Sequence, residues 1–112
     1  MIGIKLVTTE YVLDEIDVVL KRQVEDQYHQ LKTILDAVAF EVCPEPTKVE
    51  LLPVKAYVTD PKDVPIVAGA IKARVDYLVT FDRKHILRKE VIAKSGLQIV
   101  VPKTIIEKYF EE

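Results

Sequence analysis

Apolar residues follow two different spacings along this chain, and together they predict strands that alternate with helices. Residues 2–8 form a short apolar run that predicts a strand. After Thr8-Thr9, which can cap a helix, apolar residues recur every three or four positions, and they are Val12, Ile16, Val19 and Leu20. We therefore expect a helix that ends near Arg22 or Val24. Glu15 falls on the edge of its apolar stripe and is the acid best placed to reach inward.

The middle of the chain predicts a second helix and then an irregular extended segment. The second apolar stripe consists of Leu31, Ile34, Leu35, Val38 and Val42. The connection to the first helix is short, so the two helices should form an antiparallel hairpin that Pro44 and Pro46 terminate. Residues 49–58 are rich in apolar side chains but interrupted by Pro53, and this pattern predicts one short strand.

A helix that feeds a strand is expected over residues 60–82. Asp60 is a suitable N-cap with Pro61 at the first helical position, and Asp63 should lie on the inward side of the first turn. Residues 77–81 predict a buried strand that ends at Asp82. Ligands of α/β sheets bind beside the carboxyl ends of strands, so the two carboxylates are expected at one rim, where they would suit a divalent metal.

The C-terminal segment completes the expected architecture. Residues 97–101 predict a strand that Pro102 ends, and Thr104-x-x-Glu107 predicts a capping box that opens a last short helix. Strands that alternate with helices predict an α/β fold with a mostly parallel sheet flanked by helices. The length of 112 residues predicts one domain over residues 1–112.

Composition narrows the partners and the compartment that can be expected. The formal net charge is -2, so any RNA contact has to come from a local basic patch such as residues 83–89. Cys43 is the sole cysteine, which excludes an internal disulfide and fits a reducing cytoplasm. The start of the chain lacks the apolar core of a signal peptide, and no run of 18 apolar residues occurs. We expect a cytoplasmic protein without a membrane partner.

Three segments share the order and spacing of motifs found in one known family. An Asp opens an apolar, Ala-rich helix over residues 63–70, and Asp-Tyr-Leu-Val-Thr-Phe-Asp follows at residues 76–82 with His85 just behind it. Near the start, residues 6–15 lead to Glu15. In this order the motifs resemble the PIN domain, a family of small metal-dependent ribonucleases that includes the toxins of toxin–antitoxin pairs. The resemblance covers nearly all of the chain.

This resemblance implies a three-layer PIN-like fold and an endoribonuclease that hydrolyses RNA phosphodiesters with Mg²⁺ or Mn²⁺. The implied catalytic and metal-ligating residues are Glu15, Asp63 and Asp82. The residues implied or considered for RNA contact are Thr80, Arg83, Lys84 and His85. The implied partners are single-stranded RNA and an antitoxin-like protein. Carboxylates crowded at one place repel each other unless a cation is present, which is why such a cluster makes a metal site.

The chain also departs from the family pattern. PIN domains open with an apolar strand that ends in Asp-Thr-Asn, and no such run precedes residue 6. The resemblance thus implies a sheet without the first family strand and a metal site without one of its carboxylates. Three outcomes follow: hydrolysis with a single metal, a fold retained without turnover, or a native chain that starts upstream of Met1. The alternative function is a non-catalytic interaction module that self-associates, as a dimer, or binds a partner through the uncovered sheet edge.

Each candidate residue also has a simpler structural interpretation. Asp63 could be a carboxylate favoured by the helix dipole, and Asp82 could cap the following turn. Glu15 could be a solvated helix acid, Thr80 a structural hydrogen-bond donor and His85 a surface histidine. The joint occurrence of Asp63 and Asp82 at family spacing favours metal binding for that pair.

Overall fold

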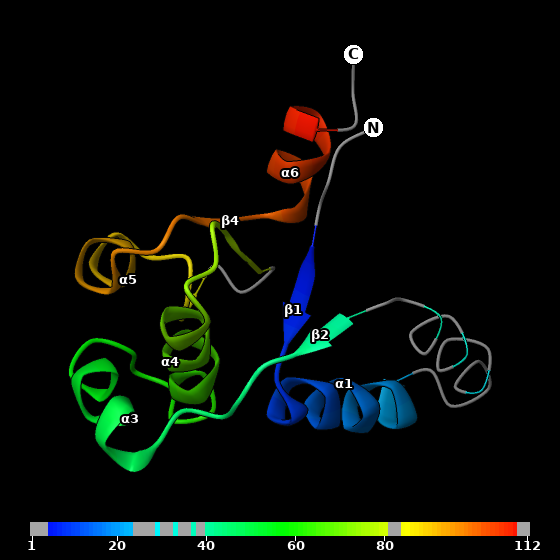
Figure 1. Cartoon of the computed structure of the whole chain (residues 1–112), viewed down its shortest axis with the longest axis horizontal. Helices are drawn as coiled ribbons and strands as arrows, with labels where there is room; N and C mark the ends of the chain where they lie inside the picture. Colours follow the sequence, from blue (N-terminus) through cyan, green and yellow to red (C-terminus); the bar gives the residue numbers. More distant parts are fainter. Residues whose placement is uncertain are drawn as a thin grey trace. The chain divides into compact units, whose positions relative to one another are not determined.

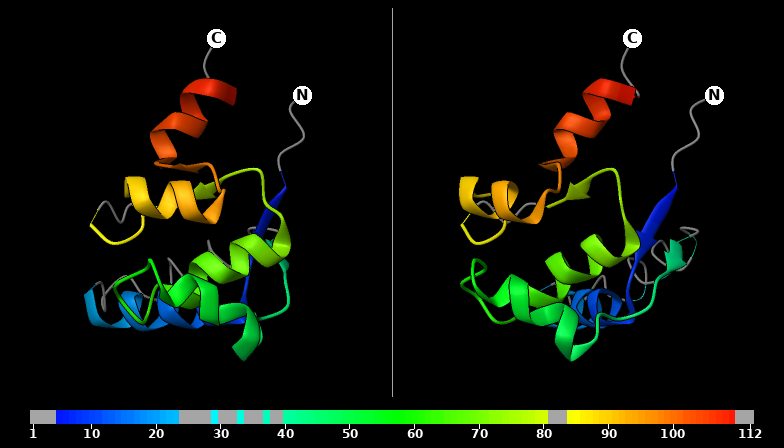
Figure 2. Two further views of the ribbon diagram at one scale, coloured as in Figure 1. Left: turned by 90° about the vertical axis from the view of Figure 1, so that its left-hand side faces the viewer. Right: turned by 60° about the vertical axis from the view of Figure 1, so that its left-hand side comes forward.

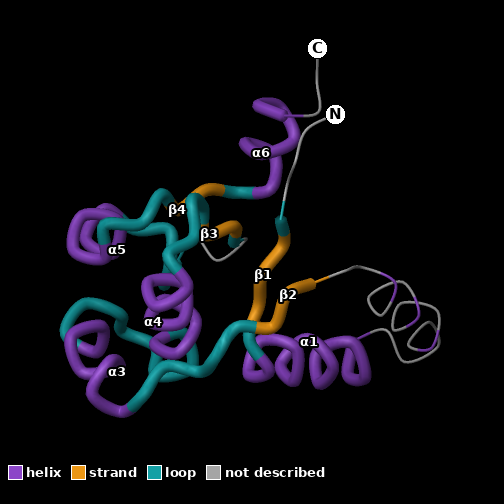
Figure 3. Tube along the Cα trace, viewed as in Figure 1, coloured by secondary structure: helices purple, strands orange, loops and turns teal. Residues whose placement is uncertain are grey.

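The structure, a computed structural model, describes residues 5–23, 29, 33, 37, 40–80 and 84–109. Contacts between residues divide the chain into two compact units, Gly3–Glu45 and Pro46–Glu112, the second of which also includes Met1–Ile2. The elements of both are labelled in Figures 1 and 3, and Figure 3 also colours them by type.

The first unit is a parallel strand pair with a helical connection. β1 (Leu6–Thr8) lies parallel to β2 (Phe40–Val42), with Leu6 opposite Phe40. The helix α1 (Glu10–Gln23) follows β1, and the hydroxyl of Thr9 accepts a hydrogen bond of 3.4 Å from the amide of Val12. The expected N-terminal strand and helix are therefore confirmed within the described residues.

The second predicted helix needs one correction. Residues 29, 33 and 37 are helical, and the Thr33 hydroxyl donates to the carbonyl of His29 at 2.9 Å, as in a helical turn. Val42, which the apolar stripe assigned to that helix, instead belongs to β2. Its backbone joins the ladder to β1, and pairing with a strand distant in the sequence overrides the local helical spacing.

The second unit opens with a helix where the sequence predicted a strand. Residues 49–58 were expected to be extended, but α3 spans Lys48–Lys55. The cause is a capping box: the Thr47 hydroxyl accepts from the Glu50 amide at 3.2 Å, and Glu50 Oε1 accepts from the Thr47 amide at 2.9 Å. Pro53 lies inside this helix, and Val54 carries its buried face.

The helix α4 (Val64–Ala73) lies beside α3, as the views in Figure 2 show. Its inward face is almost fully buried, with Val67 0 % exposed. The helix ends at Arg74, which adopts the left-handed conformation with φ 54°. The buried apolar side chains of the described part all belong to this unit, and they are Val54, Tyr57, Val58, Val64, Val67, Ala68, Ala70, Ile86, Val91, Leu97 and Ile99.

The rest of the unit is a second parallel pair. β3 (Leu78–Val79) pairs with β4 (Ile99–Val100), and α5 (Lys89–Ser95) forms the crossover between them. The expected strands over 77–81 and 97–101 are confirmed at their centres, whereas α5 was not predicted. Two parallel pairs with helical connections confirm the predicted α/β class.

The last helix begins earlier than its predicted capping box. α6 spans Pro102–Tyr109, so Thr104 is its third residue and not its cap. Proline is favoured at the first helical position, where its missing N–H is not needed. Lys108 on this helix donates to the Tyr77 hydroxyl at 2.6 Å, which joins α6 to the start of β3. The same hydrogen bond holds the pKa of the Tyr77 hydroxyl below its usual value.

None of the helices described is both long enough and apolar enough to traverse a lipid bilayer.

Candidate metal centre

Asp63 is held rigidly at the start of α4. Its amide donates to the carbonyl of Asp60 at 3.0 Å, and its carbonyl accepts from the amide of Val67 at 3.1 Å. The residue is 8 % exposed, so its side chain lies inward as predicted. Asp63 is the N-cap residue of α4, yet its carboxylate makes no capping hydrogen bond to the helix amides.

Asp60 occupies a turn ahead of the helix and not the predicted N-cap. Its Oδ1 accepts a hydrogen bond of 3.0 Å from the Lys62 amide, which closes a side-chain turn over residues 60–62. Pro61 lies in this turn, and helical structure starts at Val64, three residues later than the first position that the sequence predicted. The turn brings one carboxylate oxygen of Asp60 within 4.8 Å of one of Asp63.

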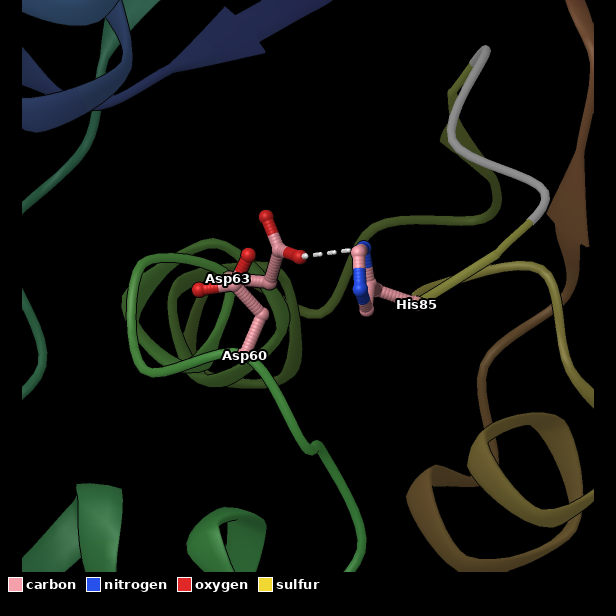
Figure 4. Close-up of side chains that lie close together, drawn as sticks. All are labelled: Asp60, Asp63 and His85. Carbon is pink, nitrogen blue, oxygen red and sulfur yellow. Dashed lines mark ion pairs between the residues drawn. The ribbon is translucent and has the colours of Figure 1, made fainter.

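His85 approaches these carboxylates from the segment that follows β3. The imidazole Nδ1 lies 3.9 Å from Oδ2 of Asp63, and Figure 4 shows the ring facing that carboxylate. The next residue, Ile86, is 2 % exposed and anchors the turn in the core. The His85 side chain remains 30 % exposed, whereas that of Asp63 is 12 % exposed. The imidazole thus lies between the buried Asp63 carboxylate and solvent.

The three side chains form a donor set suited to a divalent cation. One ligand atom from each of Asp60, Asp63 and His85 lies within 4.8 Å of the other two. Two carboxylates bring negative charge together, one of them buried, where a charge is costly unless it is paired or binds a metal. Carboxylate oxygen suits Mg²⁺ and Mn²⁺, and imidazole suits first-row transition ions such as those of iron, nickel and zinc. The residues present therefore fit a divalent metal.

Comparison with protein-family models gives one match, to the PIN domain over residues 3–84. The match covers well over half of the chain. The chain belongs to the PIN domain family. Comparisons with curated proteins and with solved structures found no significant match. The resemblance inferred from the motifs is confirmed, and it places the chain in a nuclease-type fold family.

The structure brings together only part of the residue set predicted for this PIN domain. Asp63 and His85 lie close to each other, whereas Asp82 and Arg83 fall outside the described residues. Glu15 is half-buried on α1 in the other unit. Thr80 follows β3 and its amide donates to the carbonyl of Val100 at 2.9 Å, which supports a structural role for its backbone.

Asp60 was not predicted as a ligand, and His85 was considered as a proton donor, as a phosphate contact or as a surface histidine. The available signal for Asp60 was its three-residue spacing from Asp63 across a proline-containing turn, which places both side chains on one side. For His85 the available signal was its place just behind the motif of residues 76–82, but its approach to Asp63 depends on the path of the chain through β3. His85 also lies one residue beyond the segment that matches the family. Lys84, beside it, is exposed.

Proposed function

We propose that this PIN domain is a metal-dependent endoribonuclease whose divalent ion, Mg²⁺ or Mn²⁺, is held by Asp63. The observation that carries the proposal is the buried Asp63 carboxylate at the start of α4, which has ligand atoms of Asp60 and His85 within 4.8 Å of one of its oxygens. Membership of a nuclease-type family supports the reaction class. A bound divalent ion lowers the pKa of a water ligand and neutralises charge that develops on a phosphodiester.

The chain's own residues would have distinct roles in this function. Asp63 provides the fixed carboxylate, because its backbone is hydrogen-bonded on both sides and its side chain is shielded from water. Asp82 and Glu15 would add the second and third carboxylates that the family pattern assigns. Thr80, Arg83 and Lys84 would contact the phosphates of single-stranded RNA, and exposed Lys84 is accessible for such a contact.

Removal of the Asp63 charge tests this function. We expect Asp63→Asn to abolish Mn²⁺ uptake in calorimetry and the cleavage of a single-stranded RNA oligonucleotide. Asparagine has nearly the same size and shape as aspartate, and the Asp63 side chain makes no capping hydrogen bond that would be lost, so the fold should be retained, which circular dichroism checks. Asp76→Asn is the matched control, since Asp76 is an exposed acid of the same unit. Absence of Mn²⁺ uptake by the wild-type chain at millimolar concentration, or cleavage that survives Asp63→Asn, would overturn the proposal.

A second candidate function, a non-catalytic interaction module, is favoured by apolar surface on α3. Val49 is 74 % exposed and Leu52 60 % exposed, and their three-residue spacing puts them on one side of the helix. Such a surface suits self-association or an antitoxin-like protein partner. This alternative predicts a dimer that takes up no Mn²⁺ and survives Asp63→Asn, so sedimentation of the same variants separates the two functions.

A further inference from the structure

The distance between the nearest side-chain atoms of His85 and Asp63 is longer than a hydrogen bond and short enough for two ligands of one metal ion. At 3.9 Å, Nδ1 of His85 and Oδ2 of Asp63 are too far apart for a hydrogen bond, which for N–H···O spans about 2.7–3.2 Å. Bonds from a divalent ion to imidazole nitrogen or carboxylate oxygen are about 2.1 Å, so two ligands of one ion lie at most about 4.2 Å apart. The observed separation therefore suits two ligands of a shared ion without movement of either backbone.

Asp60 completes a set of three with little adjustment. No pair of the three ligand atoms is separated by more than 4.8 Å, which a small side-chain rotation brings within reach of one ion. The Asp60 carboxylate is already oriented, because its Oδ1 accepts from the Lys62 amide at 3.0 Å. A carboxylate keeps further lone pairs for a metal while it accepts that bond. Asp60 and Asp63 therefore offer oxygen from one turn, and His85 offers nitrogen from another.

The nitrogen donor decides which ions this centre prefers. Mg²⁺ requires oxygen ligands in a nearly ideal octahedron and retains several of its waters. Imidazole is instead a preferred ligand of first-row transition ions, whose affinity for mixed nitrogen and oxygen sites rises from Mn²⁺ onward. An all-carboxylate cluster would not discriminate in this way.

We propose that His85 is a direct metal ligand through Nδ1, together with Asp60 and Asp63, and that it makes the centre selective for Mn²⁺ over Mg²⁺. The inference rests on the proposed function for the existence of a metal centre and goes further by assigning a nitrogen ligand and an ion preference. It also replaces a role of His85 as a phosphate contact. The half-exposed ring leaves a solvent-facing side at which waters can complete the coordination shell.

The test compares Mn²⁺ and Mg²⁺ affinities by calorimetry for the full chain and four variants. His85→Gln removes the imidazole and keeps a polar side chain, His85→Asp replaces the nitrogen with oxygen, and Asp60→Asn keeps the acceptor for the Lys62 amide. The matched control is His29→Gln, which alters the chain's other histidine at an exposed position. Pulsed electron paramagnetic resonance of bound Mn²⁺ adds a direct readout, since a coordinated imidazole gives a ¹⁴N coupling.

We expect wild type and His29→Gln to bind Mn²⁺ at least about tenfold more tightly than Mg²⁺ and to show the nitrogen coupling. His85→Gln should lose the coupling and weaken Mn²⁺ binding at least about tenfold, since even outer partners of metal ligands cost that much. Asp60→Asn should weaken the binding of both ions. His85→Asp should bind both ions, with the preference for Mn²⁺ reduced.

Two results would overturn the inference, and only the second would also overturn the proposed nuclease function. Mn²⁺ binding that depends on Asp63 but shows no nitrogen coupling and is unchanged in His85→Gln would refute the His85 ligand and leave the proposed nuclease function standing. Uptake of neither ion by the wild-type chain would remove the metal centre itself, and with it both proposals. If His85→Gln does not fold, the coupling in wild type and the ion preference of His85→Asp still decide the question.

Discussion

Packing of α4 against the core positions the candidate metal centre. The substitution Val67→Ala tests how strongly this helix is packed. Val67 is 0 % exposed, and its amide donates to the carbonyl of Asp63 at 3.1 Å, so the residue anchors the turn that carries the carboxylate. The substitution deletes two buried methyl-sized groups, worth about 1.6 kcal/mol of transfer free energy, and leaves a cavity that costs about 1 kcal/mol more. The higher helix propensity of alanine returns about 0.5 kcal/mol. The free energy of unfolding should fall by about 2 kcal/mol.

Urea unfolding followed by tyrosine fluorescence and circular dichroism measures this change. The chain has no tryptophan, and Tyr57, which is 8 % exposed, reports on the same core. With a denaturant dependence of about 1–1.5 kcal/mol per molar for a chain of this size, the midpoint should fall by roughly 1.3–2 M urea. Val49→Ala is the matched control, because it deletes the same atoms from a helical residue that is 74 % exposed. Its free energy of unfolding should stay within about 0.5 kcal/mol of wild type.

Equal shifts in the two variants would refute the reasoning. That result would mean that the inner face of α4 is no better packed than the outer face of α3. The fixed position of Asp63 would then lose its support.

Two further predictions concern the ends of helices. Hydrogen bonds from the Thr47 amide and then from Lys72 hold the pKa of Glu50 at about 2, below its usual 4.5. The ionised Glu50 carboxylate therefore stabilises the fold fully above about pH 4.5, and this contribution is lost as the pH falls toward 2. Glu50→Gln should flatten the decline of the unfolding midpoint over that range, and parallel pH curves would contradict this. Arg74 has φ 54°, a left-handed conformation that costs a non-glycine residue about 1–2 kcal/mol. Arg74→Gly removes this cost but adds the entropy cost of glycine, so the free energy of unfolding should rise by about 0.5–1 kcal/mol. A lower urea midpoint in the variant would contradict this.

Local sequence patterns predicted those elements whose signals lie within one or two turns of chain. The cap at Thr9 and the apolar stripe of α1 are of this kind. The helix α3 was missed because two local signals conflict there. Thr47 and Glu50 carry the same capping-box pattern that was recognised at Thr104, but Pro53 and the apolar residues around it favoured a strand. At Thr104 the box had no role, because Pro102 had already begun the helix.

What the sequence determined by itself is the family and the first candidate ligand, Asp63. The apolar spacing of the helix predicted that Asp63 lies on its inward side, although the turn over residues 60–62 that precedes the helix was not predicted. Only the tertiary structure brought in His85, which is 22 positions further along the chain and within 3.9 Å in space. The path of β3 and the burial of Ile86 set that distance, and both depend on packing between segments far apart in sequence. Local physics can therefore orient one carboxylate, whereas a donor set assembled from two turns exists only once the core has formed.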